Sequence, residues 1–117
     1  MISLIIPCFN EEESLPLFYP EVTSVLQEMN CDYELIFVND GSRDRTLEIL
    51  KELSEKDPHV IYLSFSRNFG KEAAMYAGFC NARGDYVAVM DADLQDPPAL
   101  LPEMLQKLEF GEYDSVA

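Results

Sequence analysis

The sequence contains no tryptophan, a single histidine, three cysteines and only eight lysines and arginines among 117 residues. Cys8, Cys31 and Cys80 lie far apart without metal-ligand spacing, and an odd count argues against a closed set of disulfides, so we interpret them as reduced thiols. His59 lies in a predicted loop and is expected to be solvated, with no catalytic partner near it in the sequence. Neither a Ser-His-Asp nor a Cys-His pattern is present, which argues against that kind of nucleophilic catalysis.

The shortage of cations excludes one large class of partner. Twenty-two aspartates and glutamates give a formal net charge of −14. A surface with so few cations cannot neutralise many backbone phosphates, so DNA or RNA binding is not expected. For the same reason, we expect a bound diphosphate to be neutralised by a divalent metal held on carboxylates.

Long hydrophobic runs are also missing. The apolar run at residues 2–6 is too short for a signal peptide, and no stretch approaches the roughly 20 apolar residues of a transmembrane helix. The composition, 48% hydrophobic and 26% charged, is that of an ordinary globular protein. We therefore expect one domain that folds and is soluble as it stands.

Short apolar runs alternate with stretches of helical spacing. The predicted strands cover residues 2–6, 33–38, 60–65 and 86–90, and the predicted helices cover residues 15–29, 46–53, 71–83 and 99–109. Pro20 is expected to kink or restart the first helix, and residues 113–117 resemble the opening of a fifth strand. This order predicts an α/β fold with a doubly wound, mainly parallel sheet, in which ligands bind beyond the carboxyl ends of the strands.

Acidic and amide side chains follow the strand at residues 86–90. Asp91, Asp93 and Gln95 alternate, so they would point to one side if the strand geometry persists, and their oxygens suit a hard cation such as Mg²⁺ or Mn²⁺. An Asp-x-Asp triplet is common, however, and the alternative is a solvated acidic turn.

Two other strand ends carry polar sequence. Asp40, in the Asn-Asp-Gly-Ser sequence at residues 39–42, could accept hydrogen bonds from a base or ribose, or it could simply build the turn. Residues 7–13 contain three glutamates and no glycine, which argues against a dinucleotide-binding Gly-x-Gly-x-x-Gly loop. Glu12 and Glu13 are interpreted as favourable charge in the first turn of a helix.

The segment after the third strand contains two of the few cations. Arg67 and Lys71 lie where they could meet a diphosphate or an acceptor phosphate. In so acidic a chain they could equally pair with carboxylates, and a pair at the surface would contribute little to stability.

Taken together and in order, four segments resemble family 2 glycosyltransferases. They are residues 5–11 (IIPCFNE), 38–44 (VNDGSRD), 66–71 (SRNFGK) and 90–95 (MDADLQ). The resemblance covers essentially the whole chain and is greatest to bacterial polyprenyl-phosphate (bactoprenol) glucosyltransferases, with similarity also to dolichyl-phosphate mannose synthases. It implies a Rossmann-like GT-A fold in which this chain is the nucleotide-sugar-binding part, residues 1–117, of a domain that continues further.

The resemblance also implies roles for individual residues. Pro7, Phe9 and Glu11 would line the base pocket, Asp40 would contact the uracil or ribose, and Asp91, Asp93 and Gln95 would hold Mg²⁺ or Mn²⁺ on the donor diphosphate. The donor-binding residues expected in all are Pro7, Phe9, Glu11, Asp40, Arg67, Lys71, Asp91 and Ala92.

The implied activity is inverting transfer of a sugar from a nucleotide sugar, UDP-glucose first and GDP-mannose second, to a polyprenyl phosphate. The resemblance places the acceptor-side acidic residue and the membrane helices after Ala117, so no catalytic residue is assigned and the fragment alone is expected to be inactive. The complete protein would work at the cytoplasmic face of a membrane and could form a homo-oligomer. A nucleotidyltransferase, or a non-catalytic metal- or nucleotide-binding module, is the alternative.

Overall fold

The computed structural model describes residues 1–30, 32–92 and 115–116. Within these residues the chain alternates strands and helices in the order β1, α1, β2, α2, β3, α3, β4 and β5. The strands are β1 (Ile2–Cys8), β2 (Tyr33–Asn39), β3 (Val60–Ser64), β4 (Tyr86–Val89) and β5 (Ser115–Val116). The helices are α1 (Leu15–Glu28), α2 (Thr46–Lys56) and α3 (Lys71–Asn81).

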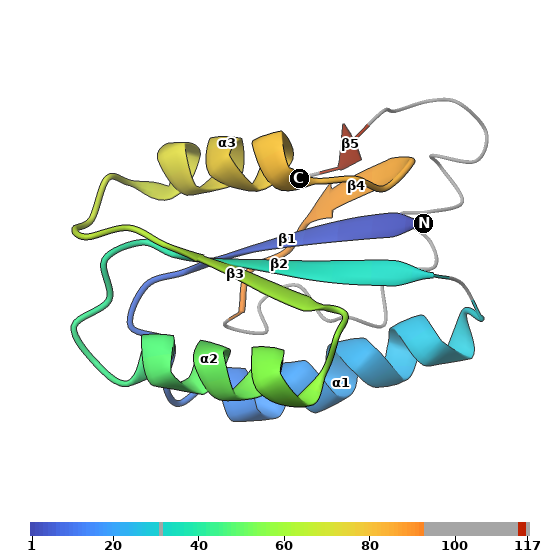
Figure 1. Cartoon of the computed structure of the whole chain (residues 1–117), viewed down its shortest axis with the longest axis horizontal. Helices are drawn as coiled ribbons and strands as arrows, with labels where there is room; N and C mark the ends of the chain where they lie inside the picture. The colour runs from blue at the N-terminus through green and yellow to red at the C-terminus, as the bar shows by residue number, and fades with distance from the viewer. Residues whose placement is uncertain (31, 93–114, 117) are drawn as a thin grey trace.

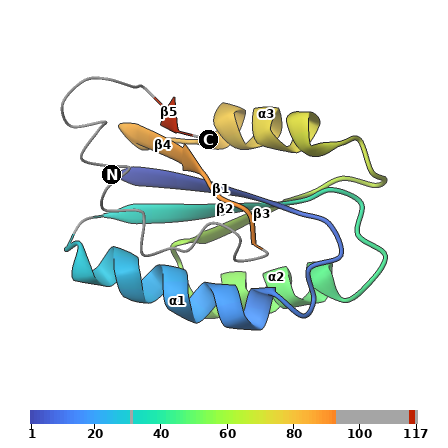
Figure 2. The same ribbon diagram turned by 180° about the vertical axis from the view of Figure 1, so that it is seen from behind.

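All described strands form one parallel sheet in the order β3-β2-β1-β4-β5. Helices α1 and α2 cover one face of the sheet and α3 covers the other, as the two opposite views show (Figure 1, Figure 2). The chain moves outward from β1 through β2 to β3 and then returns to the other side of β1 with β4. This reversal beside β1 is the position at which doubly wound sheets bind their ligands.

Strands β1 and β2 form the centre of the core. Every residue of β2 is buried, as is every residue of β1 except Pro7, which is partly exposed. Because helices cover both faces of these strands, nearly continuous apolar runs are what this position requires. Helix α3 approaches the sheet closely at Gly78, where a Cβ would lie 2.4 Å from the Ile5 side chain.

The predicted order of elements is confirmed. Observed strand ends differ from the predicted ones by one or two residues, and a strand is present at Ser115–Val116 as expected. Helix α1 runs through Pro20 without a break, so Pro20 does not restart the first helix, and the alternative of a kink stays a prediction. The helix predicted at residues 99–109 lies outside the described residues. No helix in the described part of the chain is long and apolar enough to cross a membrane.

Candidate functional site

The ladder between β1 and β4 ends where the candidate site begins. The Met90 amide donates to the Ile5 carbonyl at 2.9 Å. Pro7 has no N–H and cannot continue the ladder toward Met90. The chain is therefore free to turn away from β1 directly after Met90, and this places Asp91 at the carboxyl edge of the sheet, at the point where the strand order reverses.

The loops after β1 and β2 are tied to each other. The Asn10 amide donates to Ser42 Oγ at 2.9 Å, and the Arg43 amide donates to Asn10 Oδ1 at 2.8 Å. Asn10 has a φ of 54°, a left-handed conformation that asparagine tolerates better than most residues. These contacts give the loop after β1 a defined shape without any glycine.

Asp44 ties the same two loops together at the start of α2. Its Oδ1 accepts a hydrogen bond from the Thr46 amide at 2.9 Å, and its Oδ2 accepts one from the Glu12 amide at 3.2 Å. Burial alone would raise the pKa of Asp44, but the hydrogen bonds from Thr46 and Glu12 outweigh it and lower the pKa. Asp44 is therefore an ionised structural residue that stabilises the loops around the site.

Asp40 ties the loop after β3 to the end of β2. Its Oδ1 accepts from the Phe69 amide at 2.7 Å and its Oδ2 accepts from the Gly70 amide at 3.0 Å. Asp40 is buried, with 4% of its surface exposed. A negative charge is favourable here because Gly70 is the N-cap of α3 and the helix dipole is positive at this end. Asp40 therefore already occupies the amides that could otherwise bind a phosphate.

The two cations predicted near the site have different neighbours. Lys71, the first residue of α3, forms an ion pair with Asp91, with its Nζ 2.8 Å from Oδ1. The Arg67 guanidinium lies over the Phe69 ring, with its Cζ 4.8 Å from the ring centroid. The structure thus places Lys71 against a carboxylate and Arg67 in a cation–π contact.

These elements surround a hollow of about 140 Å³ at the carboxyl edge of the sheet, which we call the carboxyl-end hollow. Its walls come from the ends of β1, β2 and β4 and from the start of α3. The residues that line it are Pro7, Cys8, Phe9, Glu11, Asp40, Lys71 and Asp91.

Six of the eight expected donor-binding residues line this hollow, although they are spread over 85 residues of sequence from Pro7 to Asp91. The two that do not are Arg67, described above, and Ala92, which is 1% exposed and belongs to the core. Asp93 and Gln95 lie outside the described residues. The sequence analysis did not assign Cys8 to the site. Its position between Pro7 and Phe9, two expected donor-binding residues, could have indicated that it lines the hollow.

Cys8, in the carboxyl-end hollow, lies in a negatively charged environment. Burial raises the pKa of the Cys8 thiol, and the negative charges of Glu11, Asp91 and Asp44 raise it further. Cys8 therefore remains a neutral thiol, and its Sγ lies 3.4 Å from the Ile6 carbonyl oxygen. Carboxylate oxygens gathered in this way suit a hard divalent cation rather than a soft one.

A metal that is shared with a diphosphate fits this donor set. Among the described residues, no three histidine, cysteine, aspartate or glutamate side chains form a metal cage by themselves. Mg²⁺ in nucleotide sites does not need one, because it is commonly held by one or two carboxylates together with substrate phosphates. Asp91, half-buried at the edge of the hollow, is the described residue best placed for this.

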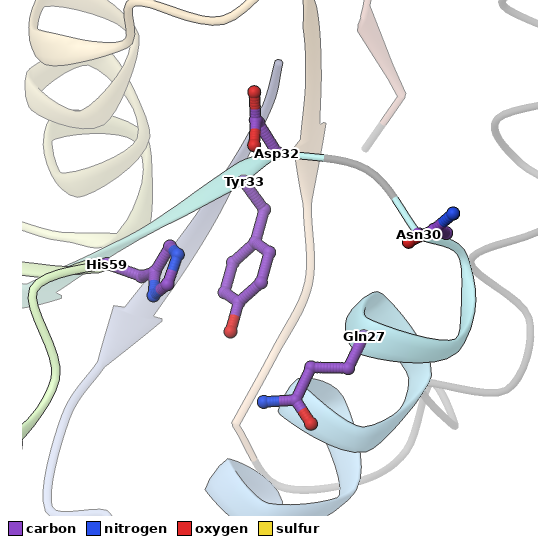
Figure 3. Close-up of a pocket in the computed structure, with 5 residues that line it drawn as sticks. All are labelled: Gln27, Asn30, Asp32, Tyr33 and His59. Atoms are coloured by element: carbon purple, nitrogen blue, oxygen red, sulfur yellow. The ribbon is translucent and has the colours of Figure 1, made fainter.

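A larger hollow, of about 510 Å³, lies at the opposite ends of the strands, their amino ends (Figure 3). The His59 ring stacks on Tyr33, another lining residue, with 4.2 Å between the ring centroids. His59 Nδ1 also lies 2.8 Å from Asp57 Oδ1. His59 is exposed, as expected, and its ring is also packed against Tyr33. This hollow lies at the amino ends of the strands, away from the polar strand ends.

The sequence model of Glycosyl transferase family 2 matches residues 3–117. The chain belongs to this family. The resemblance carried by the four strand-end segments is thereby confirmed, and all four contribute to the site described above.

A curated relative supports the same assignment. The chain is 46% identical over 110 residues to a protein of Escherichia coli K12 named prophage bactoprenol glucosyl transferase homolog. The match covers 94% of this chain and 36% of that protein. The chain thus spans about a third of the length of the curated relatives it matches.

Solved structures of transferases share the fold. One is Staphylococcus aureus TarS 1–349 in complex with UDP, with a TM-score of 0.68, 21% identity, and coverage of 93% of this chain and 32% of that one. Another is the mannosyltransferase PcManGT of Pyrobaculum calidifontis in complex with GDP-Man and Mn²⁺, with a TM-score of 0.64, 24% identity, and coverage of 79% and 27%. These likenesses confirm the GT-A fold.

Proposed function

We propose that the chain is the donor-binding part of an inverting glycosyltransferase that moves a sugar from a nucleotide sugar to a polyprenyl phosphate. UDP-glucose is the first candidate donor and GDP-mannose the second. The observation that carries the proposal is the convergence of Phe9, Asp40, Lys71 and Asp91 on one hollow at the carboxyl edge of the sheet.

The relatives support the choice of reaction. A protein 46% identical to the chain is named for glucosyl transfer involving bactoprenol, a polyprenol. Proteins of the same fold have been solved with UDP and with GDP-Man and Mn²⁺. Those names support the donor class and the acceptor class proposed for this chain.

The described side chains suit the parts of a nucleotide sugar. Phe9 is 44% exposed at the rim of the hollow, and its flat ring could stack on a base, beside Pro7 and Glu11. Asp40 retains acceptor capacity beyond the two hydrogen bonds that it accepts, because an ionised carboxylate offers about four acceptor sites. It can therefore position the loop that leads into α3 and also accept a hydrogen bond from the uracil or ribose.

We further propose that Asp91 binds a divalent cation, Mg²⁺ or Mn²⁺, together with the donor diphosphate. The sequence adds Asp93 and Gln95 to this set, both outside the described residues. Such a cation would stabilise the charge that develops on the leaving nucleoside diphosphate. Lys71, at the start of α3, is the described cation that could meet the same diphosphate.

Inversion needs the acceptor phosphate to attack the anomeric carbon from the side opposite the leaving diphosphate. A phosphate is already ionised near neutral pH, so its attack requires little help from a general base. The described side chains at the hollow bind and orient the donor, and none is assigned as a catalytic base. We propose that the acceptor-side acidic residue belongs to a part of the protein not included in this chain.

Two other functions would use part of the same site. A nucleotidyltransferase shares an acidic metal site but normally has a glycine-rich phosphate loop after its first strand, and residues 7–13 contain no glycine. A non-catalytic module would bind the nucleotide with the same affinity whether or not a sugar is attached. Neither is favoured by a structural observation.

A thermal-shift series separates a glycosyltransferase from a nucleotidyltransferase. The chain would be heated with UDP, UDP-glucose, GDP-mannose or UTP, each with Mn²⁺ and with EDTA, because a ligand that binds the folded state raises the unfolding temperature. We expect the largest rise with UDP-glucose and Mn²⁺. A larger rise with UTP than with any nucleotide sugar would contradict the proposal and favour a nucleotidyltransferase.

A further inference from the structure

Lys71 is the one cation that lines the carboxyl-end hollow in the described part of the chain. Its Nζ lies 2.8 Å from Oδ1 and 3.0 Å from Oδ2 of Asp91, so a single ammonium engages both oxygens of this carboxylate. A divalent cation at Asp91 would need these same oxygens. The two cations therefore compete for one carboxylate.

The Lys71–Asp91 pair can be broken easily. The two side chains are 57% and 30% exposed, and solvent screens the attraction between charges at such positions. The lysine ammonium is also carried on a flexible four-carbon stem.

By contrast, hydrogen bonds fix the backbone directly before each of the two paired residues. Asp40 holds the Phe69 and Gly70 amides directly before Lys71. The Met90 amide, directly before Asp91, is bonded to β1. The ammonium can therefore move while the two backbones stay in place.

We infer that Lys71 is a built-in counter-cation, which neutralises Asp91 until a divalent cation displaces it and which then binds the donor diphosphate. This inference rests on the proposed function, since it takes the site to bind metal and diphosphate together. It assigns Lys71 two successive partners, the carboxylate first and the phosphate afterwards. Replacing Lys71 should then raise the affinity for free metal and lower the affinity for the donor in the presence of metal.

The Lys71→Gln variant tests this directly, in the 117-residue chain. Mn²⁺ binding without nucleotide would be measured by electron paramagnetic resonance, and UDP binding at saturating Mn²⁺ by calorimetry. Removing the competing ammonium should tighten Mn²⁺ binding about twofold to fivefold, the size expected for an exposed ion pair. Removing the phosphate ligand should weaken UDP binding about tenfold or more.

Lys51→Gln is the matched control. Lys51 is an exposed lysine of α2, on the face of the sheet opposite to α3 (Figure 1). The substitution removes the same charge from the chain but not from the hollow, so both affinities should stay at the wild-type values. A change common to both variants would reflect net charge and would overturn the assignment to Lys71.

Two outcomes separate the inference from the proposed function. If Lys71→Gln binds Mn²⁺ no more tightly than the wild type while UDP binding still requires metal, the inference is wrong and the proposed function stands. If the wild type binds UDP equally well in Mn²⁺ and EDTA, the proposed metal site is wrong and the inference is overturned with it.

A measurement on the wild type makes the test independent of any variant. The rate of acetylation of Lys71 by an amine-reactive ester would be followed by peptide mass spectrometry, with Lys51 as internal reference. Mn²⁺ should speed acetylation of Lys71 by releasing it from Asp91, and Mn²⁺ with UDP should slow it again. A rate for Lys71 that does not respond to Mn²⁺ would overturn the inference.

Discussion

A Cβ on Gly41 would lie 2.2 Å from the carbonyl carbon of Arg67, closer than real Cβ atoms approach non-bonded heavy atoms. The backbone of the turn after β2 therefore packs directly against the backbone of the loop that follows β3. Gly41 also has a φ of +69°, in the left-handed region. This contact and the hydrogen bonds of Asp40 hold the two loops together at the edge of the carboxyl-end hollow.

Gly41→Ala should lower the free energy of unfolding by about 2 kcal/mol or more, since it adds both a steric clash and a strained φ. Urea unfolding measures the change. Gly41→Asn is the informative comparison, because asparagine tolerates a left-handed conformation but still has a Cβ. It should be nearly as destabilising as alanine. A clear rescue by asparagine would show that the backbone conformation matters and the contact with Arg67 does not.

Asp40→Ala should destabilise the loop that leads into α3, because it leaves the Phe69 and Gly70 amides without their acceptor. Loss of a hydrogen bond to a charged acceptor typically costs about 1 to 3 kcal/mol, and donor binding should weaken with it. Hydrogen exchange at Phe69 and Gly70 should accelerate, while exchange at the centre of β1 should not. Unchanged exchange at both amides, in a folded variant, would refute the positioning role of Asp40.

Glu34 should make the stability depend on pH in the acidic range. It is buried at the amino end of β2, where Ser3 Oγ donates to it at 2.6 Å and the Arg83 amide donates at 2.7 Å. Burial alone would raise the pKa of Glu34, but the hydrogen bonds from Ser3 and Arg83 and the charge of Arg83 outweigh it and lower the pKa below the ordinary 4.5. The unfolded chain then binds more protons, so this contribution is present above that ordinary pKa and is lost as the pH falls through the lower folded value.

Urea unfolding of Glu34→Gln at about pH 7 and about pH 3 checks this expectation. The variant should be less stable than the wild type at neutral pH, by about 1 to 3 kcal/mol, and the difference should narrow in acid. Some pH dependence should remain in the variant, because the pKa values of Asp44 and Asp57 are lowered as well. Glu55→Gln, an exposed change on α2, is the control. A difference of the same size at both pH values would count against the role of Glu34.

The two described cysteines should differ in reactivity. Cys8 is buried and its pKa is raised by burial and by nearby carboxylates, whereas Cys80 is exposed on α3. Because the thiolate is the reactive form, iodoacetamide should modify Cys80 and leave Cys8 intact in the folded protein. Peptide mass spectrometry gives both rates. Labelling of Cys8 as fast as Cys80 would show that the hollow is more open or less negative than described.

Much of this fold follows from local pattern. The nearly continuous apolar runs in β1 and β2 predicted strands covered on both faces, and the alternation with helical spacing predicted a parallel sheet. Because every parallel strand ends at the same edge, Phe9, Asp40 and Asp91 could be expected to meet there although they lie far apart in the sequence. Only the strand order was needed in addition, and the structure supplies it.

The partners of individual side chains could not be predicted in the same way. The sequence offered a ligand contact or a turn for Asp40, but it did not predict that both oxygens accept from backbone amides that lie 29 and 30 residues further along the chain. Lys71 and Asp91 are 20 residues apart and meet only because β4 lies beside β1. Such contacts depend on the register and closeness of loops, which residue types alone do not encode.

The most direct test of the proposed function is a calorimetric titration of UDP-glucose into the wild-type chain and into Asp91→Asn, each with Mn²⁺ and with EDTA. We predict that the wild type binds in Mn²⁺ and loses most of its affinity in EDTA. Asp91→Asn should bind weakly in both, because the substitution removes the negative charge with which Asp91 would attract the divalent cation. Equal affinity of the wild type in Mn²⁺ and EDTA, or full metal-dependent binding by Asp91→Asn, would contradict the proposed role of Asp91.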